Sequence, residues 1–362
     1  MKVALLVGTR PQIIKSVPVI EEARRRGVDL EVVHTGQHYD ELMSGVFFES
    51  FRIPAAASNL GVGSGSQGYQ VGEIITRLDR LWARDRPDAV LVPGDTNSAL
   101  ASGLLTAKLR IRLGHIEAGA RCYDMAMQEE MNRRVVDHLS NVLFAVTPQC
   151  RRNLAREAVQ GKVIVSGDTM FEVFMRSQNE INRCDVLRRL GLDPGEYFVL
   201  TFHREENTAD QAVVLSLLRE MASLGKKVVF PAHPRTRALL GPAAKGLHER
   251  VVLVDPLDYF SMMRLIRDSV LVATDSGGLQ KEAFWSRVPC LTLRERTEWT
   301  ETISLKCNFL APPSAGVTKI MKRVLGQQNA LKERLKRSGN PFSTGRERPS
   351  ERIVRGIVGR SR

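Results

Sequence analysis

Carboxylates stand at the points where apolar stretches of this chain end. Asp95 follows the run AVLVP, and Glu117 closes the run LGHIE. A carboxylate at the end of a buried strand is costly unless it has a partner or a chemical use. Because positioned carboxylates can remove and return protons, Asp95 and Glu117 are candidate acid/base groups.

A third acidic position, Glu129, begins a segment with helical periodicity, MAMQEEMNRR. Its use as an acid/base group has a plain structural alternative. Glu129 with Arg133, and Glu130 with Arg134, are i,i+4 pairs worth about 0.3 to 0.5 kcal/mol each. For this helix alone the sequence favours the structural alternative. The buried stripe of the helix would then consist of Met127, Met131, Val135 and Leu139.

The segment VGTRPQIIK places two cations just after the first apolar run. Pro11 suits the first turn of a helix, and Lys15 lies one turn beyond Arg10. The two cations could flank an anion. Alternatively, Arg10 caps neighbouring carbonyls and Lys15 is solvated. Taken alone, Arg10 and Lys15 favour neither interpretation over the other.

Small residues follow another apolar run in ATDSGGLQKEA. A strand, a tight turn and a helix start present backbone N–H groups and the positive helix end to an anion. The pattern therefore favours a phosphate cradle over a simple glycine turn. Its candidate residues are Ser276, Gly277 and Gly278, followed by Gln280 and Glu282 for ribose hydroxyls.

Two histidines also follow apolar runs: His203 opens HREEN, and His233 opens HPRTR. A histidine at a strand end can donate to a phosphate or a leaving oxygen near neutral pH. The alternative is a histidine satisfied by backbone groups, and it is favoured more for His233 than for His203. The sequence has no HExxH motif or close His/Asp cluster, so we expect no metal site.

The glycine-rich segment GVGSGSQG, residues 61–68, does not fit a dinucleotide fingerprint. It follows AAASNL, which does not resemble a strand, and no acidic residue closes a βαβ unit after it. We expect a mobile loop there and no bound NAD.

These motifs fall at the ends of short runs rich in Val, Ile and Leu, which alternate with helical or polar stretches. Such runs predict strands that are buried on both faces of parallel sheets. The first series of runs lies at 3–8, 30–36, 89–94, 113–119, 142–147 and 162–167. The second series lies at 198–203, 227–233, 251–256, 270–278 and 288–293.

Two such series predict an α/β fold of two Rossmann-like, doubly wound lobes with a central cleft at the carboxyl ends of the strands. A chain of 362 residues with 43% hydrophobic residues can bury two cores. The expected domains are residues 1–168 and 169–345, with a C-terminal helix at 346–362 that packs back on the first lobe.

The net charge of +13 would fit a polyanionic partner, but its distribution argues against one. Residues 319–362 hold 13 Lys or Arg and three Glu, a net of +10, without an RNA-binding signature. A solvated helix face is therefore favoured over a nucleic-acid surface. The five scattered cysteines predict unbridged thiols. No apolar run reaches about 18 residues, so we expect a cytoplasmic protein without a membrane span.

Nine motifs resemble, in order, those of the non-hydrolysing UDP-N-acetylglucosamine 2-epimerase family: GTRPQIIK, TGQHYDELM, GDTNSALA, HIEAGAR, QEEMNR, TFHREEN, HPRTR, DSGGLQKEA and SERIV. The resemblance spans nearly the whole chain. It implies the glycosyltransferase-B fold, a homodimer and a UDP-sugar substrate. It also implies inversion at C2 without NAD. UDP would leave to give a 2-acetamidoglucal and then return, with the proton delivered to the opposite face.

By this resemblance the acid/base groups are Asp95, Glu117 and Glu129, and His203 stabilises the diphosphate. The residues implied to bind substrate are Arg10, Lys15, His233, Arg235, Ser276, Gly277, Gly278 and Glu282. The chain departs from the family at Gln128, where Pro is common, and at Gln12, where Glu is common. The loop before Glu129 is also two residues shorter than in many bacterial members.

Other activities remain open on sequence grounds. GTRPQ and TEWTET resemble the branch that includes 2-epimerases of UDP-diacetamido-uronates. A hydrolysing 2-epimerase would release free N-acetylmannosamine and UDP. A glycosyltransferase of the same fold would pass the sugar to an acceptor, although HIEAG and QEEMNR argue against it. A nucleic-acid-binding module would show steeply salt-dependent affinity.

Overall fold

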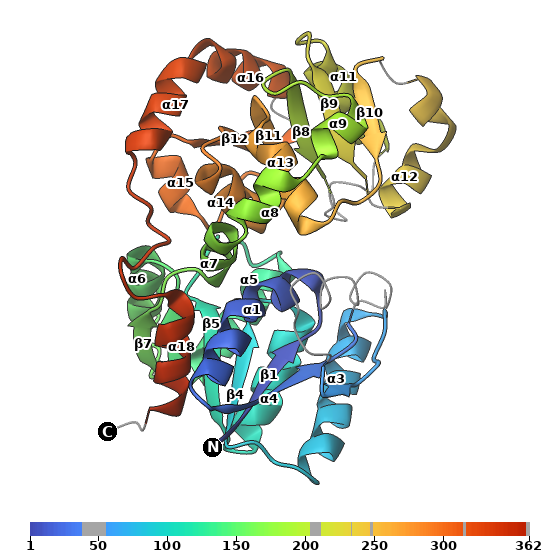
Figure 1. Cartoon of the computed structure of the whole chain (residues 1–362). Coiled ribbons are helices and arrows are strands. Elements are labelled where there is room, and N and C mark those ends of the chain that lie inside the picture. The colour runs from blue at the N-terminus through green and yellow to red at the C-terminus, as the bar shows by residue number, and fades with distance from the viewer. Residues whose placement is uncertain (38–55, 203–210, 233, 247–248, 314–315, 360–362) are drawn as a thin grey trace. The chain divides into compact units, whose positions relative to one another are not determined.

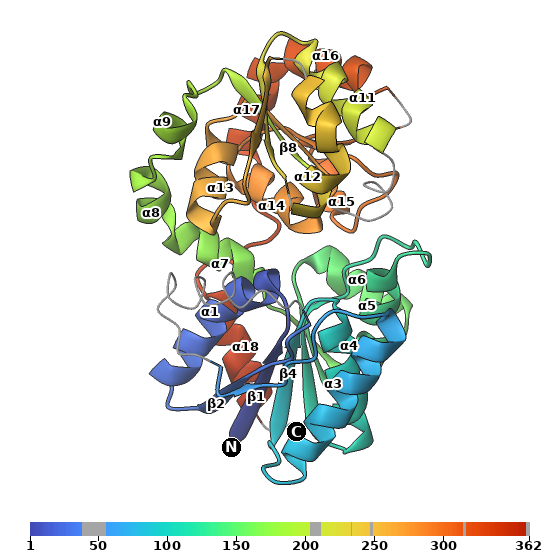
Figure 2. The ribbon, with the colours of Figure 1, turned by 90° about the vertical axis from the view of Figure 1, so that its right-hand side faces the viewer.

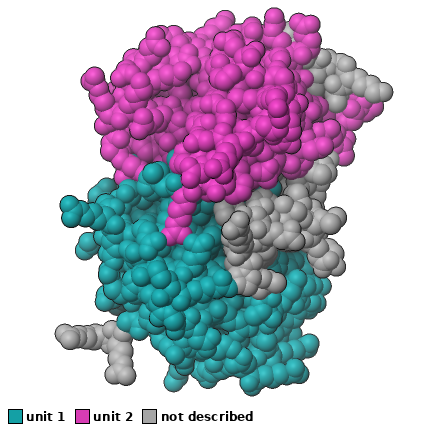
Figure 3. Space-filling model, viewed as in Figure 1, with its two compact units in different colours: residues 1–175, 341–362 teal, residues 176–340 magenta. Residues whose placement is uncertain are grey.

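The computed structural model describes residues 1–37, 56–202, 211–232, 234–246, 249–313 and 316–359. The chain forms two compact units (Figure 3). Unit 1 consists of Met1–Met175 and Pro341–Arg362, and unit 2 consists of Arg176–Asn340. The sequence analysis placed the divisions after Asp168 and after Gly345.

Unit 1 is built on a seven-stranded parallel sheet with the order β3-β2-β1-β4-β5-β6-β7. This is the Rossmann order with one further strand. The strand order reverses between β1 and β4, and sheets of this type bind ligands at that point. The strands are β1 (Lys2–Val7), β2 (Asp29–His34), β3 (Ser58–Asn59), β4 (Ala89–Pro93), β5 (Arg112–Ala118), β6 (Val142–Ala145) and β7 (Lys162–Val165).

Helices cover both faces of this sheet, with α1 and α18 on one side and α3 and α4 on the other (Figure 2). Side chains alternate along each strand, so Leu5 joins the core under α1 and α18, whereas Leu6 joins the core under α3, α4 and α5. The helices of this part are α1 (Arg10–Arg25), α3 (Gln67–Trp82), α4 (Asn97–Lys108), α5 (Gln128–Leu139), α6 (Pro148–Arg156), α7 (Thr169–Arg176) and α18 (Pro349–Val358).

The C-terminal helix α18 returns to unit 1 and lies beside α1 (Figure 1). Arg348 contacts the carboxylate of Glu22 in α1 at 3.1 Å. The carboxylate of Glu172 in α7 accepts the backbone N–H of Ser350 at 3.0 Å and its hydroxyl at 2.9 Å. Buried carboxylates therefore anchor the start of α18.

Unit 2 repeats the same winding in a six-stranded parallel sheet, β10-β9-β8-β11-β12-β13, which reverses between β8 and β11. Its strands are β8 (Tyr197–Thr201), β9 (Lys227–Pro231), β10 (Val251–Val254), β11 (Leu271–Thr274), β12 (Cys290–Thr292) and β13 (Asn308–Leu310). The predicted α/β fold of two doubly wound sheets is thus confirmed.

One face of the second sheet packs on α11, α16 and α17 through a core that includes Leu218, Met321 and Leu331. The helical segments of unit 2 are α8 (Gln178–Arg183), α9 (Val186–Leu190), α11 (Gln211–Ala222), α12 (Pro234–Leu240), η1 (Gly241–Gly246), α13 (Tyr259–Arg267), α14 (Gly277–Trp285), α15 (Thr300–Ser304), α16 (Val317–Gly326) and α17 (Gln328–Arg337).

All the predicted strand runs form strands, but β3 and β13 were not predicted. β3 consists only of the polar residues Ser58 and Asn59, and Asn308 interrupts the short apolar stretch around β13. The glycine-rich segment is a loop at residues 61–66, and Gln67 begins α3. The prediction that this loop does not follow a strand was wrong, because β3 ends at Asn59.

Candidate active site

Asp95 and Glu117 lie side by side at the carboxyl edge of the first sheet. The register of β4 and β5 pairs Pro93 with Ile116, and the backbone N–H of Gly94 donates to the Ile116 carbonyl at 2.9 Å. Asp95 therefore follows this rung by two residues and Glu117 by one. The point where the strand order reverses lies next to them, between β1 and β4.

Glu117 has a strained backbone. Its φ of 75° is left-handed, and the register of β5 against β6 shifts between Ile116 and Ala118, as in a β-bulge. A left-handed non-glycine residue of this kind costs about 1 to 3 kcal/mol and is typical of functional sites. The strained position of this carboxylate at the end of β5 is consistent with a functional role.

Lys15 holds that carboxylate. Its ammonium group forms an ion pair with Glu117, and the two side chains are only 11% and 14% exposed. The pair lies over Gly94, where an added Cβ would come within 3.2 Å of the ammonium nitrogen while the backbone sits at φ 73°. The interpretation of Lys15 as a solvated residue was therefore wrong.

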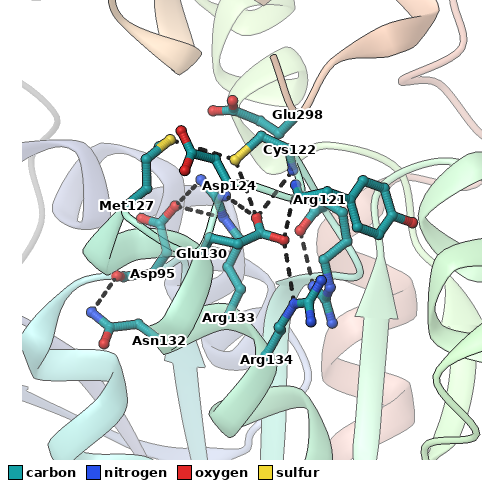
Figure 4. A network of polar contacts seen from close by, with 12 residues as sticks. Asp95, Arg121, Cys122, Asp124, Met127, Glu130, Asn132, Arg133, Arg134 and Glu298 are labelled. Carbon is teal, nitrogen blue, oxygen red and sulfur yellow. Dashed lines mark hydrogen bonds and ion pairs between the residues drawn. The ribbon is translucent and has the colours of Figure 1, made fainter. Parts of the chain in front are cut away.

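Arg133 of α5 connects Asp95 to Glu130 (Figure 4). Its Nη2 and Nε lie 2.6 and 2.9 Å from Asp95 Oδ2, and its Nη1 lies 3.1 Å from Glu130 Oε2. The amide of Asn132 also donates to the Asp95 backbone carbonyl at 2.9 Å. Both candidate carboxylates that end strands are partly buried and have ion-pair partners.

Glu130 is fully buried and holds the loop that precedes α5. It accepts the backbone N–H groups of Cys122 at 3.0 Å and Tyr123 at 3.2 Å. The predicted Glu130–Arg134 pair is present at 3.5 Å. Glu129, the acid/base candidate, is only half-buried.

The predicted buried stripe of α5 was wrong except at Met127, which is buried. Met131 is 41% exposed, and Val135 and Leu139 are only partly buried. The inward face carries Glu130, Asn132, Arg133, Val136 and Asp137 instead. Polar side chains occupy this face because each finds a hydrogen-bonding partner at the end of β4 or β5 or in the adjoining loop.

Gln12 explains one departure from the family pattern. Its Oε1 accepts the N–H of Gly8 at 2.9 Å, and its Nε2 donates to the Pro93 carbonyl at 2.7 Å. One side chain thus joins the ends of β1 and β4. The amide supplies both an acceptor and a donor, whereas an ionised glutamate supplies acceptors only. Arg10 begins α1 beside it, with Pro11 in the first turn as predicted.

In unit 2, Ser276 caps the N-terminus of α14, so the predicted helix start is confirmed. The backbone N–H of Ser276 donates to Thr274 Oγ1 at 3.0 Å, and this hydroxyl lies 2.6 Å from that of Thr201 in β8. At Gly277 an added Cβ would lie 2.2 Å from Glu298 Oε1, so the Glu298 carboxylate would have to shift to admit another residue. Gly278 follows in the first turn. Turn and helix present an N-terminus at the reversal point of the second sheet.

Gln280 does not present its side chain to a ribose, contrary to the prediction. It is fully buried, and its oxygen accepts Thr297 at 2.6 Å and Asn308 at 3.1 Å. Its amide nitrogen donates to the Ser276 carbonyl at 3.2 Å. The Gln280 side chain therefore stabilises the turn at the start of α14. Glu282 is buried in the same helix.

Three predicted site residues lack a described side chain. His203 and His233 lie outside the described residues, and Arg235 belongs to α12 but its side chain lies outside them too. Within the described ranges, no group of three or more His, Cys, Asp or Glu side chains could hold a metal ion. None of the helices in those ranges is long and apolar enough to cross a membrane.

Comparison with known proteins identifies the family. The family model described as UDP-N-acetylglucosamine 2-epimerase matches residues 21–358. The chain belongs to this family. A Methanococcus maripaludis UDP-N-acetylglucosamine 2-epimerase homolog is 39% identical over 86% of this chain and 88% of its own. The Pseudomonas aeruginosa UDP-2,3-diacetamido-2,3-dideoxy-D-glucuronate 2-epimerase is 37% identical over the same shares.

Solved structures place this epimerase-family chain in the same fold. The Methanocaldococcus jannaschii UDP-GlcNAc 2-epimerase in complex with UDP-GlcNAc and UDP has a TM-score of 0.90 and 34% identity over 99% of both chains. Phytolacca americana UGT2, complexed with UDP-2fluoro-glucose and pterostilbene, has a TM-score of 0.62 at 11% identity over 99% of both chains, and so shares the fold alone.

The sequence analysis missed two features of this family member's site. Arg133 and Glu130 were interpreted only as surface pairs, and the buried pair His115–Asp137, at 2.6 Å, was not considered. The signal was present as charged residues on successive turns of α5 next to two strand-end carboxylates. A search for helical periodicity ranks residues by hydrophobicity, however. It therefore predicted that the polar face of α5 is exposed to solvent.

Proposed function

We propose that this protein interconverts UDP-N-acetylglucosamine and UDP-N-acetylmannosamine by inverting C2 of the sugar, without NAD. One observation carries the proposal: the strained Glu117, paired with Lys15, stands beside Asp95 at the reversal point of the first sheet. Strain and ion pairing fix two carboxylates where this type of sheet binds ligands. The UDP-GlcNAc and UDP bound in the M. jannaschii relative support the same substrate class.

The reaction requires a proton at C2 to leave one face and return to the other. A carboxylate takes the proton, the C1–O bond breaks, and UDP departs with the electron pair to leave a 2-acetamidoglucal. Return of UDP to C1 and of a proton to the opposite face of C2 completes the inversion. Such acid/base catalysis is worth about 10² to 10⁴-fold.

Asp95, Glu117 and Glu129 are the proposed acid/base groups. Glu130 is excluded from this role because both of its oxygens already accept hydrogen bonds from backbone and arginine groups. Lys15 forms an ion pair with the Glu117 carboxylate and so holds this proposed base in position.

The diphosphate needs cations and N–H donors as its charge develops. We assign this role in unit 1 to Arg10 and Lys15. In unit 2 the proposed diphosphate and ribose ligands are His203, His233, Arg235, Ser276, Gly277, Gly278 and Glu282. The capped N-terminus of α14 supports this part of the proposal. We further propose that the protein works as a cytoplasmic homodimer.

A second candidate is the 2-epimerisation of a UDP-2,3-diacetamido-uronate. The P. aeruginosa enzyme that acts on such a sugar is 37% identical to this chain, which is a higher identity than the 34% of the M. jannaschii UDP-GlcNAc 2-epimerase. The reaction at C2 would be the same, with a carboxylate at C6 and an acetamido group at C3 of the sugar.

Proton NMR in heavy water tests both candidates. Purified protein with UDP-N-acetylglucosamine, without NAD, is expected to exchange the C2 proton for deuterium and to form the manno epimer. Free N-acetylmannosamine with UDP would indicate a hydrolysing enzyme instead. No change with this sugar, but turnover of the diacetamido-uronate, would assign the second substrate. No change with either would contradict the proposal and favour a transferase that requires an acceptor.

A further inference from the structure

The buried carboxylate of Asp137, in the last turn of α5, contacts the proposed catalytic strand end at several points. It has no exposed surface. Its Oδ1 lies 2.6 Å from His115 Nδ1, and its Oδ2 accepts the N–H of Gly119 at 3.1 Å. Arg121 Nη2 lies 2.7 Å from Oδ2 and pairs with Glu157 as well. One side chain thus holds β5 on both sides of Glu117.

His115 extends these contacts to the neighbouring strand. Its Nε2 lies 2.8 Å from the carbonyl oxygen of Gly94, the residue that precedes Asp95. Burial acts to raise the pKa of the Asp137 carboxyl, but His115 and Arg121 hold that pKa below its ordinary value. Asp137 is therefore ionised, and both ring nitrogens of His115 face acceptors. His115 therefore links the Asp137 carboxylate to the end of β4.

The contacts fall on the left-handed turns of the site. Gly94, Glu117 and Gly119 have φ values of 73°, 75° and 81°. Asp137 bonds directly to the N–H of Gly119, and through His115 it holds the carbonyl of Gly94. A strained backbone persists only where its surroundings over-determine it. The Asp137–His115 pair supplies that restraint at the edge where Asp95 and Glu117 stand.

We propose that Asp137, acting through His115, is a positioning residue that keeps Glu117 and Asp95 in place for proton transfer at C2. The inference rests on the proposed function and adds residues that contact no substrate. We call the contacts of Asp137 and His115 with Gly119 and Gly94 the clamp. Because a misplacement of about 1 Å can cost about 10²-fold in rate, loss of the clamp is expected to lower kcat and to leave KM nearly unchanged.

Two substitutions separate the clamp from simple stability. Asp137→Ala removes every contact, so kcat is expected to fall about 10²-fold. Asp137→Asn preserves the contacts to Gly119 and His115, because the amide oxygen can face Gly119 and the amide NH₂ can donate to Nδ1. It loses the negative charge beside Arg121, which keeps Glu157 as its ion-pair partner. This variant should stay within about tenfold of wild-type kcat. The matched control is Glu172→Ala, which removes another buried carboxylate of unit 1 that anchors α18.

The expected result is that both alanine variants lower the melting temperature, but only Asp137→Ala loses kcat. An equal loss of kcat in Glu172→Ala, or a rise in KM instead of a fall in kcat, would overturn the proposal. If Asp137→Ala does not fold, ¹⁵N NMR of the histidine rings decides. The Nδ1 proton of His115, assigned with His115→Gln, should appear at low field in the wild type because the Asp137 carboxylate accepts it, and its signal should change in Asp137→Asn. A His115 ring without this low-field proton would refute the clamp. Absence of C2 exchange in the wild type would refute only the proposed function, since the NMR result does not depend on turnover.

Discussion

Arg133 is the residue whose removal tests most directly whether the polar face of α5 builds the site. Replacing it with methionine keeps a long, unbranched side chain but removes the guanidinium between Asp95 and Glu130. We expect this single change to lower both the stability of unit 1 and the rate of the proposed reaction.

The magnitude follows from the contacts. Arg133→Met removes the 2.6 and 2.9 Å contacts to Asp95 and the 3.1 Å contact to Glu130. Removing one partner of a buried ion pair costs about 3 to 5 kcal/mol. Glu130 keeps the N–H groups of Cys122 and Tyr123, so the lower end, about 3 kcal/mol, is expected. For a unit of this size that corresponds to a decrease in Tm of roughly 6 to 12 °C. Losing the orientation of Asp95 should reduce kcat by about 10²-fold.

The assay combines thermal unfolding followed by circular dichroism with deuterium exchange at C2 of UDP-N-acetylglucosamine. The matched control is Arg134→Met, one residue further along α5. Arg134 is 33% exposed and lies 3.5 Å from Glu130, so its loss should cost at most about 1 kcal/mol. If Arg133→Met unfolds at the temperature of Arg134→Met, or retains wild-type kcat, the buried network does not position Asp95 and the reasoning is refuted.

Three further predictions concern separate parts of the chain. Hydrogen bonds from Arg25 lower the pKa of Glu22 from 4.5 to about 2, so the unfolded state binds more protons than the folded state. The contribution of Glu22 to the free energy of unfolding, about 3 kcal/mol, should be complete above about pH 5 and should be lost as the pH falls toward 2. Glu22→Gln should remove this acid-sensitive component from urea unfolding curves measured between pH 7 and 3, and an unchanged pH dependence would contradict it. Ser276→Ala should cost about 0.5 to 1 kcal/mol by uncapping α14 and weaken UDP binding in calorimetry, whereas unaltered UDP affinity would argue against the phosphate cradle. Burial raises the pKa of the Cys290 thiol to about 12, so iodoacetamide at pH 8 should leave it unmodified in the folded protein and label it after denaturation, as read by mass spectrometry.

Much of the fold could be predicted because its signals are local. Runs such as AVLVP and VALLV are apolar throughout, and a strand that is buried on both faces needs no other information. Turn and cap residues such as Pro11 and Ser276 likewise act on their own helix. The two-residue strand β3 could not be predicted, since its pairing with β2 depends on the sheet edge rather than on its own composition.

The site divides in the same way. The sequence alone determined that Asp95, Glu117 and Ser276 stand at the ends of strands, because the length of each apolar run sets where the polar residues begin. Only the tertiary structure decided which of them have partners. Lys15 pairs with Glu117, which is 102 positions away in the chain. The side chain of Arg133 is buried because Asp95 accepts its hydrogen bond. A polar side chain is buried when a distant group satisfies it, and no local pattern records where that group will lie.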